Sequence, residues 1–349
     1  MKIIRIGEHT IGAGHPCLIV AEAGVNHNGD PESARRLVDG AFEAGADAVK
    51  FQTFKTERLV SPEAPKAAYQ VRTTGAEESQ FEMLKRLELP PEAHRSLLAQ
   101  CRRQGIAFLS TPFDEESADF LDSLGVPAFK IGSGEVTNLP LLRHVARKGK
   151  PIILSTGMSW LGEVEAAVRA IREAGGPGLA LLHCVSNYPA DPRDANLRAM
   201  RTMAEAFDVP VGYSDHTLGA DVALAAVALG ACVIEKHFTL DRNLPGPDHR
   251  ASLEPAELAA LVKGIRTVEL ALGTGRKEPA ASEADVAGAA RKSLVMARDA
   301  AAGTVLTEDL VSIQRPGTGL PPAVLPYVIG RRLRRDVAAG AVITLAMLG

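Results

Sequence analysis

Short apolar runs alternate with segments of helical pattern along most of the chain. Each run is apolar throughout, which is typical of strands that are covered on both faces, as in parallel sheets. Eight runs are present: Cys17–Ala21, Ala46–Phe51, Ile106–Leu109, Val126–Ile131, Pro151–Leu154, Leu179–His183, Val209–Tyr213 and Ala231–Ile234. Eight strand–helix units over about 260 residues predict a (β/α)8 barrel.

The segments between the runs carry helix start and stop signals. Asp30 followed by Pro31 is an N-cap with a first-turn proline, and Gly45, Gly105 and Gly125 stand where helices should end. A doubly wound open sheet is the alternative fold. Such sheets usually carry G-x-G-x-x-G after the first strand, and this chain lacks it there. The barrel is therefore the preferred prediction, over residues 1–273.

The pattern changes after Gly273. Residues 274–290 are polar and rich in alanine and glycine, which predicts a linker. Residues 291–349 contain the strand-like runs SLVMA, TVLT, LVSI, YVIG and VITL. AAGTVLT at 301–307 and AAGAVIT at 338–344 echo one another, and their glycines predict matching turns before strands. A small, mainly β domain is expected, which at this size should lean on another surface.

Composition narrows the function classes. Aromatic residues make up 4% and the net charge is −3, which argues against a surface for nucleic acid or anionic lipid. No apolar run approaches the ~20 residues of a membrane span, and the N-terminus lacks the features of a signal peptide. The four cysteines form no C-x-x-C pair. We expect a protein of the reducing cytoplasm, with no membrane or nucleic-acid partner.

Polar side chains follow nearly every predicted strand, at the end of a barrel where active sites lie. They are Glu22, Lys50, Gln52, Ser110, Thr111, Lys130, Ser133, Glu135, Ser155, Asn187, Tyr188, Ser214, Asp215, His216, Glu235 and His237. Some of the serines and threonines are expected only to cap helices. Two lysines at strand ends, with serines and glycine-rich turns, predict a phosphate or carboxylate site.

His216 and His237 follow the last two predicted strands, and acids surround them. Two imidazoles at neighbouring strand ends suit a divalent metal that keeps open coordination positions. The alternative is a pair of unrelated polar loop residues, because their spacing fits no compact ligand motif.

Several motifs together resemble the sialic acid synthase family, over nearly the whole chain. They are AEAGVNHNGD, AVKFQTF, STPFD, FKIGSGE, LLHCVSNYP, GYSDHTLG and EKHFTLDRNLPGPDHRASLEP. The tail, with its QRPGTGL loop, resembles the family's antifreeze-like (SAF) domain. The resemblance implies condensation of phosphoenolpyruvate with an open-chain N-acyl hexosamine, which releases phosphate.

The resemblance also implies roles for individual residues. His216 and His237 would hold the metal, expected to be Mn2+ with Mg2+ or Co2+ as alternatives, and no organic cofactor is implied. The implied phosphoenolpyruvate ligands are Lys50, Lys130, Ser133, Ser155, Asn187 and Ser214. The implied sugar contacts are Gln52, Tyr188, Asp248 and Glu22, with Arg315 reaching the sugar of the partner subunit in a domain-swapped homodimer.

Mechanistic reasoning adds a candidate for the residue that positions or deprotonates a water molecule, which must attack C2 of phosphoenolpyruvate. Glu135, beside the predicted phosphate site, is the first candidate, and Glu22 is the second. The alternative for Glu135 is a loop carboxylate that only pairs with a lysine.

Two substrates stay open within the family. N-acetylmannosamine would give N-acetylneuraminate and is the main prediction, while a 2,4-diacetamido-2,4,6-trideoxymannose would give N,N'-diacetyllegionaminate. A synthase that condenses phosphoenolpyruvate with a phosphorylated sugar is a more remote alternative. A non-catalytic barrel that binds sugars or anions is another, which the dense polar strand ends disfavour.

Overall fold

The computed structural model describes residues 3–349, which form two compact units: unit 1 ends at Gly273, and unit 2 is Thr274–Gly349. In unit 1 the eight strands of one sheet follow the order β5-β4-β3-β10-β9-β8-β7-β6, and every hydrogen-bonded neighbour is parallel. β5 and β6, at the two ends of this order, lie side by side and close the ring. The predicted barrel is confirmed.

All eight predicted strands are present, and most extend further toward their carboxyl ends than the apolar runs suggested. They are β3 (Leu18–Gly24), β4 (Ala48–Thr53), β5 (Ala107–Pro112), β6 (Phe129–Ile131), β7 (Ile152–Ser155), β8 (Leu179–Cys184), β9 (Val211–Asp215) and β10 (Val233–His237). Most of the extra residues are polar, and they can continue the strands because pairing in a parallel barrel satisfies the backbone whether or not the side chain is apolar. Several site residues thus lie on strands and not on loops.

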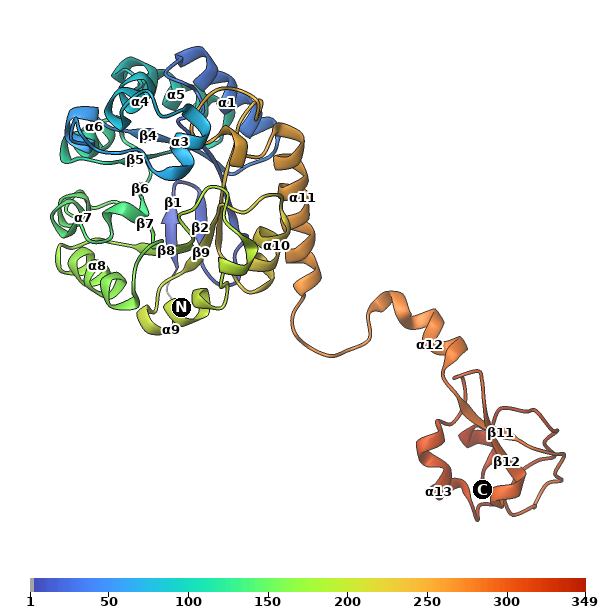
Figure 1. Ribbon diagram of the computed structural model, residues 1–349. Coiled ribbons are helices and arrows are strands. Elements are labelled where there is room, and N and C mark those ends of the chain that lie inside the picture. The colour runs from blue at the N-terminus through green and yellow to red at the C-terminus, as the bar shows by residue number, and fades with distance from the viewer. Residues whose placement is uncertain (1–2) are drawn as a thin grey trace. The chain divides into compact units, whose positions relative to one another are not determined.

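Helices surround the strands (Figure 1). They are α1 (Pro31–Glu43), α5 (Pro91–Gln104), α6 (Glu115–Leu124), α7 (Leu139–Ala146), α8 (Leu161–Glu173), α9 (Ala199–Phe207), α10 (Asp221–Ala228) and α11 (Pro255–Leu272). The Asp30 side chain accepts from the backbone N–H groups of Glu32 and Ser33, as the sequence predicted for this cap. α5 and α6 end at glycines in the left-handed conformation, where a Cβ would be strained.

Two short strands close one end of the barrel. β1 (Ile4–Ile6) and β2 (His9–Ile11) form an antiparallel hairpin. The sequence analysis did not predict these two strands. Ile4, Ile6 and Ile11 belong to a buried cluster with strand residues such as Leu18 and Val233. The hairpin therefore shields the apolar interior at the amino ends of the strands, opposite to the end that carries the polar residues.

A polar insertion follows β4, at about residues 54–80, and it also contains helices. It forms α2 (Thr56–Leu59) and α3 (Ala68–Thr74), which precede α4 (Gln80–Leu87). No helix in residues 3–349 is long and apolar enough to cross a membrane.

Unit 2 has its own buried core, which includes Leu294, Leu306, Leu333 and Ile343. β11 (Ser293–Met296) pairs antiparallel with β12 (Val311–Gln314), and isolated bridges join other runs, such as Val295 to Val342. Gly303 and Gly340 both have positive φ, near +80°, which explains the repeated glycine. One expectation was wrong: YVIG is not a strand but overlaps α13 (Leu325–Val328). The predicted linker 274–290 contains a short helix, α12 (Ala284–Ala290).

Candidate functional site

The interior of the barrel changes from apolar to charged along the strands. Alternate residues of a strand point to the same side, so β3 places Leu18, Val20 and Glu22 in one row. Leu18 and Val20 lie in the inner apolar cluster, whereas Glu22 lines a cavity at the carboxyl ends. β10 repeats the pattern with Val233 followed by Glu235. The polar side chains that follow each apolar run therefore meet in this cavity, because the row of alternate residues that face the interior continues beyond the end of the run.

Four buried charges form what we call the charged layer: Glu22, Lys50, Lys130 and Glu235. Lys50 Nζ lies 2.8 Å from Glu22 Oε2 and 3.9 Å from Glu235 Oε2. Lys130 Nζ lies 3.4 Å from Glu235 Oε1. Each charge is thus compensated inside the protein, which buried ions require.

The charged layer shifts the pKa values of its members. Burial raises the pKa of Glu22, although the charge of Lys50 acts in the opposite direction. For Glu235 burial acts the same way, but Lys130 and Lys50 outweigh it and its pKa is lowered. Burial lowers the pKa of Lys130, while for Lys50 the attraction to Glu22 and Glu235 outweighs burial and the pKa rises. Glu22 is therefore the carboxylate of this layer that takes up a proton most readily.

Hydroxyl groups surround the two lysines. Lys130 Nζ donates to Ser155 Oγ (2.8 Å), and Lys50 Nζ donates to Thr111 Oγ1 (3.1 Å). Ser214 Oγ donates to Glu235 Oε1 (3.0 Å). Two ammonium groups with adjacent hydroxyls offer several donors in one place, which is the arrangement that a phosphate or carboxylate needs.

The backbone at Gly157 also lies close to the residues that line this cavity. The Gly157 N–H donates to Ser133 Oγ (2.9 Å). A Cβ at Gly157 would lie 2.3 Å from Ser186 Oγ and 2.9 Å from Cys184 Sγ, so only glycine fits here. The turn after β7 is thereby held against Ser133.

The two predicted histidines lie next to each other. The ring centroids of His216 and His237 are 5.5 Å apart, and both residues are buried. Burial lowers the pKa of both, for His237 well below its usual range, so both imidazoles are neutral at pH 7. His216 Nδ1 lies 2.6 Å from Val185 O, and the N–H of that nitrogen would donate to it. His237 Nδ1 is buried and has no hydrogen-bond partner among residues 3–349.

These features fit a metal ion with few protein ligands. A neutral imidazole that donates one N–H to a backbone carbonyl can offer its other nitrogen to a metal. Within the described part of the chain, no group of three or more His, Cys, Asp and Glu side chains forms a metal site. Water or substrate oxygens would have to complete the coordination of an ion held by His216 and His237. The metal stays a prediction.

An ion pair outside the barrel lining connects the same strands. Asp215 and Lys236 are paired in the β9–β10 register, and Lys236 Nζ lies 2.7 Å from Asp215 Oδ2. Both side chains are fully buried. The pair lies one residue from each histidine and fixes the two strand ends relative to one another.

The outer part of the cavity is lined by residues predicted to contact a sugar. The cavity has a volume of about 400 Å³, and Gln52, Tyr188 and Asp248 line it. The Tyr188 ring lies between the histidines and α3, with centroids 4.3 Å from His216 and 5.0 Å from Tyr69. Burial raises the pKa of Asp248 to about 6.

Eleven of the predicted site residues line this single cavity: Glu22, Lys50, Gln52, Lys130, Ser133, Ser155, Tyr188, Ser214, His216, His237 and Asp248. Three do not. Glu135 accepts a hydrogen bond from Asn138 Nδ2 (2.7 Å) at the start of α7, Asn187 is exposed, and Arg315 belongs to unit 2. The geometry therefore favours Glu22 over Glu135 for chemistry in the cavity.

Other lining residues had been given no role from the sequence, although Glu235 was among the polar residues at the strand ends. Glu235 connects both lysines, and its position two residues before His237 was the available signal, because residues i and i+2 of a strand face the same side. Tyr69, Gln70 and Leu59 come from the insertion and carry no motif that could have indicated their place.

Comparison with known proteins identifies the family. The NeuB family model matches residues 37–277, and the SAF domain model matches residues 291–349. The chain belongs to the NeuB family. This confirms the resemblance to the sialic acid synthases that the motifs indicated.

Three similar proteins illustrate the range of identity within the family. N,N'-diacetyllegionaminic acid synthase of Legionella pneumophila is 49% identical and covers 94% of both chains. N,N'-diacetyllegionaminic acid synthase of Campylobacter jejuni is 50% identical over 87% of this chain and 91% of its own. The crystal structure of N-acetylneuraminic acid synthetase from Leptospira borgpetersenii serovar Hardjo-bovis in complex with citrate is 38% identical, with a TM-score of 0.72, over 82% of this chain and 95% of that one.

Proposed function

We propose that this protein condenses phosphoenolpyruvate with 2,4-diacetamido-2,4,6-trideoxymannose and water to give N,N'-diacetyllegionaminate and phosphate. The main support for this type of reaction is the charged layer, which lies beside two neutral histidines. The choice of sugar rests on the two relatives near 50% identity, which bear the name of the legionaminate enzyme. This replaces the main expectation from the sequence, N-acetylmannosamine, which becomes the second candidate.

Lys50 and Lys130 would bind the carboxylate and phosphate of phosphoenolpyruvate, with Ser133, Ser155 and Ser214 as additional donors. Binding brings a trianion to a layer whose two lysines are balanced by two carboxylates. Protonation of Glu22, whose pKa is raised, would leave the layer with a positive charge and favour the anion.

The sugar would bind in the outer cavity with its aldehyde toward His216 and His237. A divalent metal held there would act as a Lewis acid on the aldehyde oxygen. The protein's own contribution is to orient C1 of the aldehyde toward C3 of phosphoenolpyruvate, with Gln52 and Asp248 as sugar contacts.

Formation of the C1–C3 bond leaves a positive charge at C2, and the aldehyde oxygen takes up the proton that Glu22 holds when the anion binds, which returns Glu22 to its carboxylate form. Water then attacks C2 and loses a proton to a base. Glu22, buried at 2.8 Å from Lys50, is our candidate for this base. The C2–O bond to phosphate breaks last: the C2 hydroxyl becomes the ketone, its proton leaves with the phosphate, and the lysines stabilise that leaving anion.

A synthase for phosphorylated sugars is disfavoured by the cavity. Such a substrate needs a second cluster of basic side chains at the far end of the sugar. Among the described residues, Lys50 and Lys130 are the only lysines or arginines that line the cavity, and both lie in the charged layer.

Phosphate release tests the reaction. The purified protein with Mn2+, phosphoenolpyruvate and the diacetamido sugar should release phosphate and form a nonulosonate that mass spectrometry detects. N-acetylmannosamine and an aldose phosphate are the comparison substrates. No release with any N-acyl hexosamine would overturn the proposal.

We also propose that Arg315 contacts the sugar bound by a partner subunit. The side chain is exposed, and its Nε donates to Ala290 O (3.0 Å) within unit 2. Subunit exchange between Arg315→Ala and Lys50→Met proteins tests this idea. One intact site should form in each mixed dimer and restore activity, whereas a contact within one subunit predicts no recovery.

A further inference from the structure

One part of the cavity lining is apolar. Val25, Leu59, Met83, Leu87 and Phe113 line it, and we call these five residues the apolar wall. They belong to one hydrophobic cluster, in which Met83 and Leu87 are buried core members and Leu59 and Phe113 are half-buried. The segments that carry them follow β3 and β5 or belong to α2 and α4.

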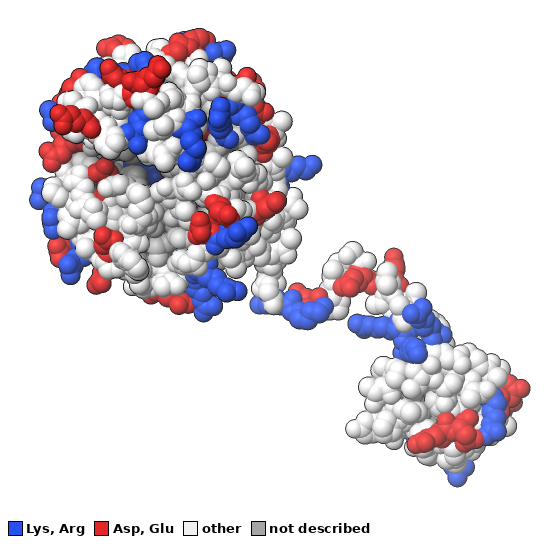
Figure 2. Space-filling model, viewed as in Figure 1, with Lys and Arg blue, Asp and Glu red and all other residues white. Residues whose placement is uncertain are grey.

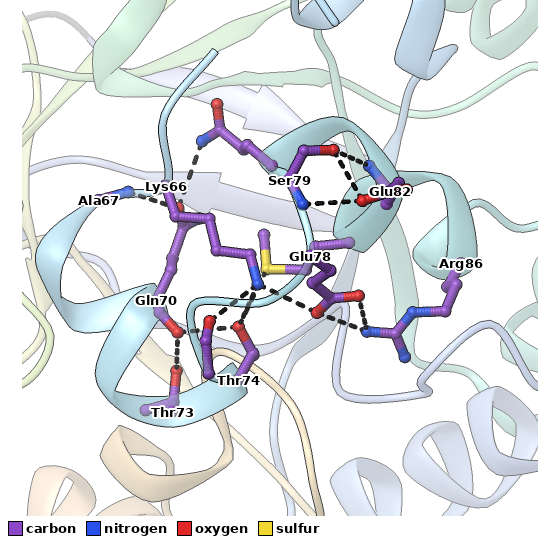
Figure 3. A network of polar contacts seen from close by, with 12 residues as sticks. Lys66, Ala67, Gln70, Thr73, Thr74, Glu78, Ser79, Glu82 and Arg86 are labelled. Atoms are coloured by element: carbon purple, nitrogen blue, oxygen red, sulfur yellow. Dashed lines mark hydrogen bonds and ion pairs between the residues drawn. The ribbon is translucent and has the colours of Figure 1, made fainter. Parts of the chain in front are cut away.

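Polar contacts around Lys66 hold α3 and α4 in place (Figure 3). Lys66 Nζ donates to Thr74 Oγ1 (2.9 Å), to Gly75 O (3.1 Å) and to Glu78 Oε1 (3.1 Å). Glu78 also accepts from Arg86 of α4 (2.8 Å). Thr74 Oγ1 lies 3.7 Å from Met83 Sδ. The network fixes the segment before α3 to α4, so Met83 and Leu87 present a formed surface and need not be ordered by the ligand.

The aromatic contacts indicate which end of a sugar would meet this wall. Tyr188 contacts both histidines and also Tyr69. Tyr69 belongs to the insertion, which forms one side of the cavity. A sugar whose aldehyde lies at His216 and His237 would therefore extend its distal carbons toward Leu59 and Met83.

We propose that the apolar wall selects sugars whose distal end is a methyl group in place of a hydroxymethyl group. This inference rests on the proposed function and adds a specificity element to it. A C6 methyl buries apolar surface against Leu59 and Met83. A C6 hydroxyl packed against Leu59 and Met83 would lose water and gain no partner from them, since these two side chains offer no strong acceptor. Discrimination of this kind is on the order of 10- to 100-fold in kcat/KM.

Two N-acyl sugars that differ only at C6 isolate the effect: N-acetylmannosamine and its 6-deoxy analogue. The wild-type protein should show a kcat/KM on the order of tenfold or more in favour of the 6-deoxy sugar. Met83→Gln keeps the side-chain length and supplies an amide, so this ratio should fall toward one. Leu59→Gln, at a half-buried position where folding is less at risk, should lower it in the same direction.

Lys85→Gln is the matched control, because Lys85 is exposed on the same helix. It should leave the ratio unchanged. Equal kcat/KM values for both sugars in the wild type, or a ratio that survives both glutamine variants, would overturn the inference while phosphate release still supports the synthase. Absence of phosphate release with every sugar would overturn the proposed function, and this inference with it.

Discussion

The charged layer and the apolar wall face the same cavity but are built from different parts of the chain. Glu22, Lys50, Lys130 and Glu235 lie on barrel strands, where each backbone is hydrogen-bonded to its neighbours. Leu59 and Met83 lie on helices outside the ring of strands. Strands position charges rigidly, which electrostatic catalysis requires. Segments outside the barrel can change without disturbing that layer, which suits them to substrate choice.

The distribution of charge on the surface does not point to a different function. On the face drawn in Figure 2, acidic and basic side chains are interspersed over unit 1, and the net charge of the chain is −3. The charges that matter for the proposed chemistry are the buried ones.

The largest effect is expected when a charge is removed from the charged layer on the strands. Lys130→Met takes away the donor to Ser155 and a partner of Glu235. We expect kcat/KM for phosphoenolpyruvate to fall on the order of 1,000-fold. Lys150→Met, which removes a surface ion pair with Asp122, should change it less than twofold. A Lys130 variant that folds and keeps activity within tenfold would contradict the role of the charged layer.

A carboxylate substitution should have the next largest effect. Glu22→Gln keeps the shape of a cavity residue but removes the proposed base, so kcat should fall on the order of 100-fold or more. Glu135→Gln should change kcat little, because that carboxylate bonds to Asn138 and does not line the cavity. The opposite order of effects in steady-state kinetics would restore Glu135 as the first candidate.

Asp248 tests the outer cavity through pH. Burial raises its pKa in the folded state to about 6, above its value in the unfolded chain. Its protonated form therefore stabilises the fold at low pH, and this contribution is lost as pH rises toward and through 6. Asp248→Asn should be more stable than the wild type by up to about 3 kcal/mol above pH 7, with a smaller difference near pH 4.

Urea unfolding at several pH values measures that difference, with the exposed Glu43→Gln variant as the control. The same Asp248 variant should raise the sugar KM about tenfold if the carboxylate holds a sugar hydroxyl, a charged hydrogen bond. A stability difference that does not depend on pH would show that Asp248 does not titrate as its burial suggests.

The smallest expected effect concerns the support of the apolar wall. Lys66→Met removes three hydrogen bonds inside the network of Figure 3. Loss of buried partners should destabilise the segment by about 1–3 kcal/mol, raise the sugar KM a few-fold and leave the KM of phosphoenolpyruvate unchanged. Hydrogen exchange of residues 66–80 reports the local loosening directly. Equal changes in both KM values would show that the insertion supports the charged layer as well.

The sequence alone determined the barrel and most of its polar mouth. Continuous apolar runs indicate parallel strands, and the residues that follow such runs must meet at one end of a barrel, so Lys50, Lys130, His216 and His237 could be chosen as a set. The motifs then supplied the family.

Only the tertiary structure decided how these residues are paired and what faces them. Glu235 was visible as a strand-end acid, but its bridging of two lysines depends on β4 and β6, which do not pair with β10 and meet it only across the interior of the barrel. Glu135 was the first candidate from the sequence and Glu22 the second, but the turn after β6 directs Glu135 to Asn138. The apolar wall had no signature, because Val25, Leu59 and Met83 gather through packing between separate segments, and packing leaves no period or spacing in a sequence.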